Sequence, residues 1–408
     1  MRILFLCQRV PWPPDRGDRI TTWHFLAHLL DSGHEVDVCC FTESDADLEG
    51  VAFLRTRCRS VTAPRIHRGM RKLTALRGLL TGEALTVPFF RHRELARAVA
   101  GAFRPTPPDL VYVYSSSMAQ YVLDLPGAPR LMQFAELDSD KWAQVAATRS
   151  GIGAWVYRRE ARLLLEFERA VARAFDASVV VSDVEKQLFE QRIPQVTAHV
   201  LPNGVDTAHF AASDPAVREP HTVIFTGVMD YEPNVDAVTW FARECWPRVR
   251  ARHPDARFLV VGSSPSAAVR ALAGRDGIEV TGRVPQTTPW FARSAIAVAP
   301  LRLARGVQNK VLEAMSTGLP VVCSAQAAQG LGTVPGDTLL VRDGAEATAA
   351  ALIDLMDRPA AAIAIGTRAA SWVRSHFEWH RMHQRFDAIC AQAAAHHRAS
   401  HAVQRVSR

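Results

Sequence analysis

The chain has 408 residues, of which 48% are apolar and 22% charged, and its formal net charge is +7. This composition is typical of a globular chain long enough to form two domains. No run of about 18 consecutive apolar residues occurs, so the sequence predicts no membrane-spanning helix. The N-terminal apolar run is interrupted by Gln8 and Arg9, which makes it too short for a signal peptide and favours a first strand.

The seven cysteines contain no C-x-x-C pair, so we interpret them as unpaired thiols in a reducing cytoplasm. Four of them fall in apolar, strand-like segments, where buried packing is the expected role: Cys7, Cys39, Cys40 and Cys323.

Apolar segments typical of strands alternate along the chain with segments of helical periodicity. In the first half, the predicted strands are Arg2–Cys7, Glu35–Phe41, Ser60–Ala63, Asp109–Tyr114, Arg130–Phe134, Ala177–Ser182 and Ala198–Leu201. Helical periodicity is clearest in Arg19–Asp31 and Trp155–Ala174. A polar, irregular stretch at 209–220 is predicted to be a linker, because it contains two acid–proline pairs.

The alternation then restarts and predicts a second domain of the same class. Its expected strands are Thr222–Thr226, Arg257–Val261, Ile278–Thr281, Ile296–Pro300 and Pro320–Cys323. Alternating strands and helices predict an α/β fold with two doubly wound parallel sheets and ligands beyond the carboxyl ends of the strands, in the crevice between the domains. We place the N-terminal domain at 1–208 and the C-terminal domain at 221–375. Residues 376–408 are expected to form a helix, His376–Ala391, with Trp379 in the core, and then a loosely ordered tail.

One segment of the first domain is strongly basic. Between Glu49 and Glu83 the chain has no acidic residue. The same stretch carries Arg55, Arg57, Arg59, Arg65, Arg68, Arg71, Lys72 and Arg77, and leucines with helical spacing at Leu73, Leu76 and Leu80. Two interpretations stay open: residues 55–80 lie on an anionic membrane surface, or they form a solvated basic helix. No nucleic-acid-binding module is recognised, so no nucleic-acid partner is predicted.

The most informative segment is Arg305–Val322, RGVQNKVLEAMSTGLPVV, which reads as a loop, a short helix and a buried strand. Free backbone N–H groups at a helix N-terminus attract phosphate, and Lys310 in the first turn adds a positive charge. Glu313 lies on the same helix face one turn later, where a carboxylate can accept two hydrogen bonds from a ribose diol. The segment therefore indicates a nucleotide-diphosphate-sugar site, although a solvated (i, i+3) pair of Lys310 and Glu313 remains the alternative.

Several segments resemble the GT-B glycosyltransferases of family 4. They are LEAMSTGLPVV, FTGVMDYEPNVDAV (Phe225–Val238), VVSDVEKQLF (Val180–Phe189) and VLPNGVDTAHF (Val200–Phe210). The opening CQRVPWPPDRGDRITTWHFLAHLLDSGHEVDV fits the first strand, glycine-bearing loop and first helix of that family. The chain looks closest to the sugar transferases associated with PEP-CTERM/exosortase exopolysaccharide systems.

The resemblance implies two Rossmann-like domains facing across a cleft, with the C-terminal helix returning to the N-terminal domain. It implies a retaining, metal-independent hexosyltransferase without a cofactor, whose donor is a UDP- or GDP-sugar bound by the C-terminal domain. The implied acceptor is a saccharide or polyprenyl-linked saccharide in exopolysaccharide or cell-surface glycan synthesis. Such an enzyme would be cytoplasmic, and peripheral on the inner face of the membrane if residues 55–80 bind lipid.

The resemblance also assigns the donor residues. Glu313 matches the glutamate that binds the donor ribose, and Gly17 matches the loop glycine that lets the backbone approach the donor phosphate. Arg305 stands where family members have a sugar-contacting glutamate. Gly227 is not followed by the usual Arg and Lys, so we assign the positive charge to Arg302, Arg305 and Lys310. The remaining predicted donor-binding residues are Gly306, Asn309 and Arg283, the last against the nucleotide base or as a surface cation.

On the acceptor side, relatives carry a histidine where this chain has Glu136, Asp138 and Asp140. We predict that Asp138 is the catalytic base or orients the acceptor with Glu136, and that Arg16 contacts the acceptor; Lys310 and Arg305 are the other predicted catalytic residues. For Asp138-Ser139-Asp140 a helix N-cap is the alternative, and no metal is predicted there.

Two other functions stay open. An isomerase of the nucleotide-sugar 2-epimerase kind shares this architecture and would act without an acceptor. A non-catalytic nucleotide-sugar-binding protein is the second, because Arg305 replaces the expected glutamate.

Overall fold

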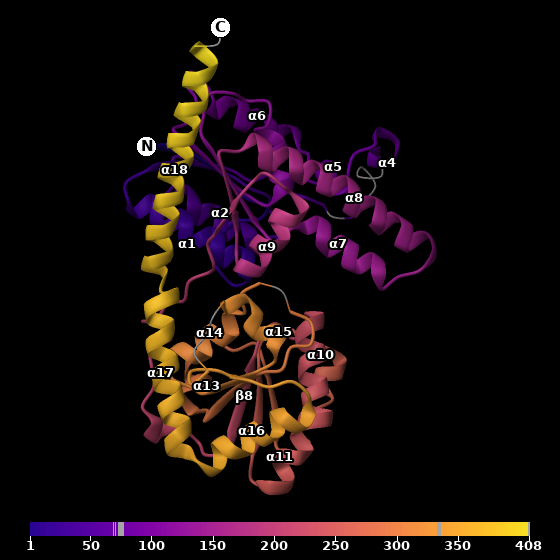
Figure 1. The fold of residues 1–408 in the computed structure, drawn as a ribbon, viewed down its shortest axis with the longest axis vertical. Coiled ribbons are helices and arrows are strands. Elements are labelled where there is room, and N and C mark those ends of the chain that lie inside the picture. Colours follow the sequence, from indigo (N-terminus) through magenta and orange to yellow (C-terminus); the bar gives the residue numbers. More distant parts are fainter. Residues whose placement is uncertain (68, 70, 72–76, 305, 333–335, 407–408) are drawn as a thin grey trace. The chain divides into compact units, whose positions relative to one another are not determined.

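The structure, a computed structural model, describes residues 1–67, 69, 71, 77–304, 306–332 and 336–406. The internal contacts of the chain divide it into two compact units (Figure 1). One unit comprises Met1–Leu201 together with His383–Arg408, and the other comprises Pro202–Met382. Each unit contains one parallel sheet, so the predicted pair of doubly wound α/β sheets is confirmed.

The first unit is built on a seven-stranded sheet. Its strands are β1 (Arg2–Leu6), β2 (Glu35–Cys39), β3 (Ser60–Thr62), β4 (Leu110–Tyr114), β5 (Arg130–Ala135), β6 (Ala177–Val180) and β7 (Ala198–Val200). The order across the sheet is β3-β2-β1-β4-β5-β6-β7, and each neighbouring pair is parallel. Every predicted strand of this half is present within two residues of its expected ends. The central strands are almost wholly buried, as expected where helices cover both faces of a sheet.

The helices of the first unit connect these strands. They are α1 (Gly17–Asp31), α2 (Ala46–Arg55), α4 (Arg77–Thr81), α5 (Thr86–Phe89), α6 (Arg93–Ala102), a 3-10 turn (Ser116–Tyr121), α7 (Asp138–Ala147), α8 (Gly151–Ala174) and α9 (Asp183–Arg192). The predicted leucine spacing at Leu73 and Leu76 lies outside the described residues, as do Arg68 and Lys72.

The C-terminal helix α18 (Trp379–Val406) begins in the second unit and continues in the first. Phe386 stacks on Phe25 of α1 at 4.6 Å between ring centroids and lies edge-on to Tyr112 of β4 at 5.6 Å. The predicted return to the N-terminal domain is thus confirmed by packing. The prediction of a loose tail from Gln392 was wrong, because the helix runs on to Val406, and His397 pairs with Asp176 of the first unit at 3.3 Å.

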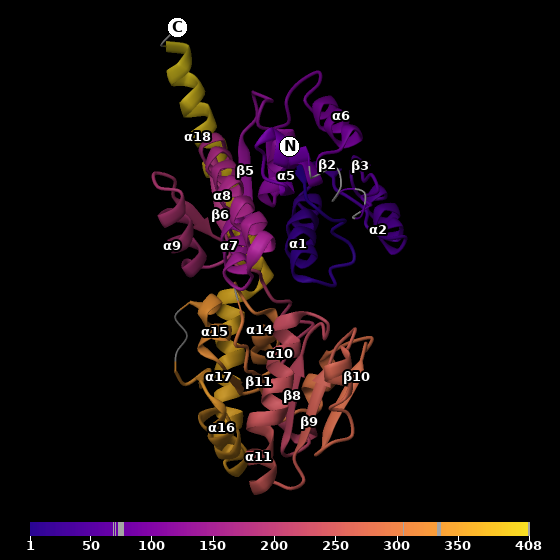
Figure 2. The same cartoon turned by 90° about the vertical axis from the view of Figure 1, so that its right-hand side faces the viewer.

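The second unit has a six-stranded sheet, and Figure 2 labels its strands β8, β9, β10 and β11. Its strands are β8 (Thr222–Thr226), β9 (Arg257–Val261), β10 (Ile278–Gly282), β11 (Ile296–Ala299), β12 (Val321–Cys323) and β13 (Leu340–Val341). The order is β10-β9-β8-β11-β12-β13, again parallel throughout. Only β13 was missed by sequence reasoning, because its two residues are too short to show a periodicity.

The helices of the second unit are α10 (Glu232–Trp240), a π-helical segment (Phe241–Cys245), α11 (Trp246–Arg252), α12 (Ala267–Arg270), α13 (Thr288–Arg293), α14 (Asn309–Ser316), α15 (Ala325–Ala328), α16 (Ala345–Asp357) and α17 (Pro359–Phe377), with 3-10 turns at Pro215–Val217 and Gln329–Leu331. The stretch expected as a linker, 209–220, belongs to this unit. Arg218 Nη2 donates to Gly318 O at 2.9 Å, and Ser316 Oγ donates to Phe210 O at 2.8 Å. These bonds fix the stretch against the end of α14.

All seven cysteines are free thiols, and the four placed in strand-like segments are buried as predicted. Trp379 is also buried, as predicted, and packs on Gly204, where a Cβ atom would lie 2.6 Å from its ring. Among the described residues, no helix combines the length and the apolar character needed to cross a bilayer.

Candidate functional site

In the second unit, the strand order reverses between β8 and β11, and such switch points are where open α/β sheets bind ligands. Gly227 follows β8, while the loop that leads into α14 follows β11. A Cβ atom at Gly227 would lie 2.7 Å from Asn234 Nδ2 and 3.4 Å from Lys310 Nζ. A glycine at this position therefore lets the first turn of α14 approach the end of β8.

Lys310 is held in place at this point by two contacts. Its Nζ donates a hydrogen bond of 2.5 Å to Asn234 Oδ1 and lies 4.8 Å from the centroid of the Phe225 ring. Burial lowers the pKa of Lys310 to about 8, partly offset by the charge of Glu313. Asn234 was missed by sequence reasoning. The sequence offered one signal for this role: Asn234 is the third residue of the helix that follows Gly227. The first turn of that helix faces the end of β8.

Glu313 lies one turn after Lys310 on the same helix, as the spacing predicted. Burial raises the pKa of its carboxyl to about 7, although Lys310 works in the opposite direction. Among the residues that the structure describes, none donates a hydrogen bond to this carboxylate. A partly buried carboxylate without donors is costly, and a ligand with a diol would satisfy it.

The loop before α14 has the backbone features of an anion site. Gly306 adopts a φ of 60°, in the left-handed region that favours glycine. Asn309 begins the helix, where the first N–H groups have no partner within the helix, and its Oδ1 accepts a hydrogen bond from Asn203 at 3.4 Å. Arg305 lies outside the described residues. Helix α17 supports the other end of α14, since a Cβ atom at Gly366 would lie 1.9 Å from Gly318 O.

The two other predicted donor-side arginines are placed differently. Arg302 is exposed and pairs with Asp236 of α10, with 3.0 Å between Nε and Oδ2, while its guanidinium lies over the Trp240 ring. Arg283 is exposed after β10, at the edge of the sheet and two strands away from β8. In the described part of the chain, neither side chain forms a hydrogen bond or ion pair with Lys310 or Glu313.

In the first unit, the strand order reverses between β1 and β4. The loop after β1 leads to Arg16, which precedes α1, and to Gly17, its first residue. A Cβ atom at Gly17 would meet no other atom within 4 Å, so packing within this unit does not require glycine there. The backbone at the start of α1 is thus open to a ligand.

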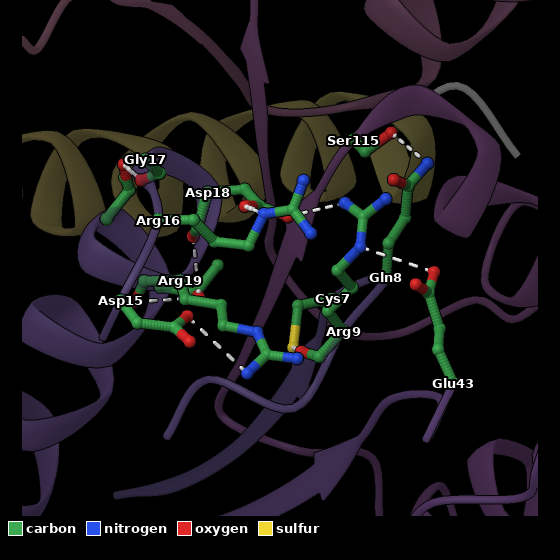
Figure 3. A network of polar contacts seen from close by, with 12 residues as sticks. Cys7, Gln8, Arg9, Asp15, Arg16, Gly17, Asp18, Arg19, Glu43 and Ser115 are labelled. Atoms are coloured by element: carbon green, nitrogen blue, oxygen red, sulfur yellow. Dashed lines mark hydrogen bonds and ion pairs between the residues drawn. The ribbon is translucent and has the colours of Figure 1, made fainter. Parts of the chain in front are cut away.

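A half-buried arginine that sequence reasoning missed, Arg9, organises this loop (Figure 3). Arg9 Nη1 lies 2.5 Å from Asp18 Oδ2, and its Nε lies 3.3 Å from Glu43 Oε1. Although burial works against the charge, Asp18 and Glu43 raise the pKa of Arg9. Arg16 pairs with the other oxygen of Asp18 at 3.3 Å. Asp18 therefore joins the two arginines at the carboxyl end of β1.

Asp138 and Glu136 follow β5 in the same unit. Burial raises the pKa of Asp138, opposed by the charges of Lys141 and Arg9, so Asp138 and Arg9 are close enough to interact. The alternative of a helix N-cap is not observed, because Leu137 occupies the N-cap position of α7 and no side chain caps the helix.

The two residues that follow Asp138 bind other parts of the first unit. Ser139 Oγ donates to Glu168 of α8, and Asp140 accepts from Arg192 at 3.1 Å. Burial raises the pKa of Glu168 to about 8. Because Asp138, Ser139 and Asp140 face different partners, they do not form a common ligand set.

A cavity of about 500 Å³ opens beside the α1 loop in the first unit. Its lining is mainly charged or polar and consists of Arg16, Arg19, Glu43, Ser44, Asp47, Ile66, His67 and Gly69. Arg19 is held there by Asp47, with Nη2 2.5 Å from Oδ1. The cavity thus presents both signs of charge next to Gly17.

Within the described residues, one group has ligand atoms close enough together for a metal ion: His221, His253 and Asp255. His221 Nδ1 lies 2.8 Å from Asp255 Oδ2, and the group stands at the amino end of β8. That is the opposite end of the strand from Gly227 and Lys310, so the group takes no part in the candidate donor site.

Comparison with known proteins finds a glycosyltransferase family match for each unit. Residues 17–204 match the family described as "Glycosyl transferase 4-like domain", and residues 220–358 match "Glycosyl transferases group 1". Together these two matches span most of the chain.

Two curated relatives and a solved structure are among the proteins that are similar to the chain. It is 32% identical over 188 residues to a phosphatidyl-myo-inositol mannosyltransferase of Mycolicibacterium smegmatis, covering 44% of this chain and 48% of the relative. It is 28% identical over 231 residues to the lipopolysaccharide core biosynthesis mannosyltransferase LpcC of Rhizobium leguminosarum bv. viciae, covering 53% and 64%. The matched parts thus span about half to two thirds of these relatives.

The structure superposes on sucrose-phosphate synthase from Thermosynechococcus elongatus with a TM-score of 0.71, covering 97% of this chain and 99% of the other at 18% identity. At that identity the likeness establishes the fold. Two parallel sheets with this fold, combined with the two family matches, place the chain among the GT-B glycosyltransferases of the family 4 type.

Proposed function

We propose that this protein transfers a sugar from a nucleotide-diphosphate sugar to a saccharide or lipid-linked saccharide acceptor in the synthesis of an exopolysaccharide or other cell-surface glycan. The observation that carries the proposal is the pair Lys310 and Glu313, set one turn apart on α14 at the switch point of the second sheet. The names of the two curated relatives, a phosphatidyl-myo-inositol and a lipopolysaccharide core mannosyltransferase, support a surface-glycan role. They make GDP-mannose the first donor to test, with UDP-sugars next.

Lys310 is proposed to stabilise the leaving diphosphate. As the sugar–oxygen bond breaks, negative charge grows on the β-phosphate, and a fixed cation in a site that excludes water is most effective there. Asn234 holds the Lys310 ammonium against the end of β8, so little rearrangement is needed. A bound diphosphate favours the charged form of this lysine, whose pKa burial lowers to about 8.

Around Lys310, the N–H groups near Gly306 and Asn309 are proposed to hold phosphate oxygens, while Glu313 accepts hydrogen bonds from the ribose. We keep Arg305 as a second catalytic cation, and Arg302 and Arg283 as donor contacts. Arg302 would first have to leave Asp236, which makes it the weakest of these assignments.

For the acceptor, we propose the loop edge of the first unit. Asp138 is the base or the group that orients the acceptor hydroxyl, and burial has already raised its pKa toward the range useful for proton transfer. Glu136 and Arg16 are proposed acceptor contacts, and the cavity beside Arg16 offers room for part of the acceptor. Gly17 is proposed to let the backbone approach the donor phosphate. The reaction is proposed to retain the anomeric configuration and to need neither a metal ion nor a cofactor.

We also propose a cytoplasmic location, peripheral to the inner face of the cell membrane. The basic segment 55–80 supports this less than its sequence suggested, because most of its described arginines are paired within the first unit. Arg57 pairs with Asp31 at 2.5 Å, Arg59 with Asp37 at 2.7 Å and Arg65 with Asp45 at 2.7 Å.

The test is a two-step assay. Nucleotide diphosphates and nucleotide sugars are first screened by thermal shift, since a ligand at 100 times its dissociation constant stabilises the native state by about 2.7 kcal/mol. The best donor is then incubated with and without lipid-linked saccharide acceptors, with and without EDTA, and the anomeric configuration of the product is determined. Full transfer by Lys310→Ala and Glu313→Ala variants would refute the site.

The same assay separates the competing functions. Formation of an epimer of the donor without any acceptor would favour the 2-epimerase-type isomerase. Tight donor binding without turnover over a broad acceptor panel would favour the non-catalytic binding protein.

A further inference from the structure

Helices α7 and α8 form a long hairpin in the first unit whose tip is apolar and exposed. Figure 1 shows the two helices running side by side. They are joined by a turn at 148–150, and the first residues of α8 lie at the tip. Ile152 is 84% exposed there and Trp155 54%, an unusual exposure for side chains of this size.

The tip is held rigidly. Trp142 of α7 stacks on Tyr157 of α8 with 5.4 Å between ring centroids, and the Arg149 guanidinium lies 5.0 Å from the centroid of the Tyr157 ring. Stacked rings between the two helices fix their spacing just below the turn. The exposure of Ile152 and Trp155 is therefore a property of a packed hairpin.

The base of the hairpin is fastened as well. Glu160 accepts hydrogen bonds from the backbone N–H groups of Leu85 at 2.5 Å and Thr86 at 2.9 Å, both at the start of α5. Arg159 donates to the backbone oxygens of Gly78 and Glu83 at 2.7 and 3.1 Å. These bonds join α8 to the short helices beside it, so the tip moves as part of the first unit.

The charged residues around the tip of the hairpin are all cationic. Residues 141–159 contain one lysine and three arginines and no acidic residue. Lys141, Arg149 and Arg158 are all exposed, and none of them forms an ion pair with an acidic residue in the described part of the chain. This differs from Arg57 and Arg65, which pair with carboxylates of their own unit.

We propose that this hairpin tip docks on an anionic phospholipid surface, with Trp155 and Ile152 inserted at the level of the headgroups and Arg149 and Arg158 against the lipid phosphates. Tryptophan beside exposed aliphatic side chains partitions into the interface of a bilayer, and cations around it add attraction to anionic lipid. Exposed cations near two protruding apolar side chains complement a negatively charged, deformable surface. This proposal rests on the membrane location proposed above: the hairpin tip would be the part of the protein that binds the membrane. Its binding does not depend on the donor site.

The test uses the full chain and vesicles of phosphatidylcholine mixed with phosphatidylglycerol, with pure phosphatidylcholine for comparison. The wild-type protein is expected to sediment with the mixed vesicles and much less with the neutral ones. The double variant Ile152→Ser/Trp155→Ser is expected to lose this binding. Arg149→Gln and Arg158→Gln should each weaken it roughly fivefold, corresponding to about 1 kcal/mol per cation, and should reduce its dependence on salt.

Matched controls lie elsewhere on the molecule. Val217→Ser removes an apolar side chain that is 59% exposed in the second unit, and Arg173→Gln removes an exposed cation at the other end of α8; both should bind vesicles like the wild type. Brominated phospholipid adds a direct readout, because it quenches only tryptophans that reach the lipid. Quenching should be seen in the wild type and lost in Trp155→Phe.

The outcomes separate this inference from the proposed function. Lys310→Ala should abolish transfer and keep vesicle binding, whereas the tip double variant should lose vesicle binding and keep transfer to a water-soluble acceptor. Vesicle binding that survives in the tip variant, or quenching that survives in Trp155→Phe, overturns the inference. Sedimentation velocity gives a further outcome that overturns the inference: a wild-type dimer together with a monomeric tip variant. The apolar tip would then bind a second copy of the chain.

Discussion

Replacing Glu313 by glutamine should stabilise the protein while it weakens nucleotide binding. Folding raises the pKa of this carboxyl from 4.5 to about 7, because burial disfavours its charge. With a raised folded-state pKa, stability is greatest where both states are protonated, falls as the pH rises above about 4.5, and is constant above about 7. The two pKa values differ by about 2.5, and one pKa unit corresponds to about 1.36 kcal/mol. Above pH 7 the buried carboxylate therefore lowers the free energy of unfolding by roughly 3 kcal/mol.

Glutamine has the shape of the protonated carboxyl and removes this penalty. Glu313→Gln should therefore raise the free energy of unfolding by up to roughly 3 kcal/mol at pH 8 and change it little near pH 4. Urea unfolding at the two pH values measures this. Where the two units unfold at different urea concentrations, GDP or UDP identifies the relevant transition of the wild type. The ligand stabilises the unit that binds it, so the transition that moves to higher urea belongs to the unit that holds Glu313.

Glu346→Gln serves as the control, because Glu346 is exposed on α16 of the same unit. Because Glu346 lies in the first turn of α16, where a carboxylate interacts favourably with the helix dipole, this change should lower the unfolding free energy by at most about 1 kcal/mol and should not raise it at pH 8. A loss of stability in Glu313→Gln at pH 8, or an equal gain at both pH values, would refute the reasoning. Either result would mean that the carboxylate is satisfied inside the free protein and is not waiting for a ligand.

Four further outcomes are expected. Nucleotide affinity should be greatest between about pH 7 and 8, falling below it as Glu313 gains a proton and above it as Lys310 loses one, which calorimetric titration over this range can measure. Lys310→Met should lower kcat by about 10²–10³-fold without changing the melting temperature of the free protein by more than a few degrees. Gly17→Ala should leave the melting temperature unchanged, because its Cβ meets open space, yet lower the transfer rate. Gly204→Ala should cost about 1–3 kcal/mol in urea unfolding, because its Cβ would lie 2.6 Å from the Trp379 ring.

The strands could be predicted because most are short, predominantly apolar runs between polar turns, and this pattern is local. Strand β13 could not, since two residues carry no periodicity and pair with β12 only through the tertiary fold. The C-terminal tail was misjudged for a similar reason: its helix is stabilised by contacts to residues far away in sequence, such as that of His397 with Asp176.

In the candidate site, residues whose role depends on spacing were predicted, and residues whose role depends on partners were not. Lys310 and Glu313 occupy the predicted helix face, because residues three apart in an α-helix are nearly one turn apart. Arg9 looked like an interruption of an apolar run, and its function as the link between Asp18 and Glu43 exists only once the loop has folded.

The division of α18 between the two units has a consequence for biosynthesis. The second unit is one continuous stretch, Pro202–Met382, whereas the first needs Phe386 to cover Phe25 and Tyr112. At about 5–20 residues per second, the ribosome takes roughly 10 to 40 s to travel from the end of β7 to Phe386. During that time an aromatic face of the first sheet and α1 is open to water. The nascent chain is therefore expected to depend on chaperones at its N-terminal half, although that half is made first.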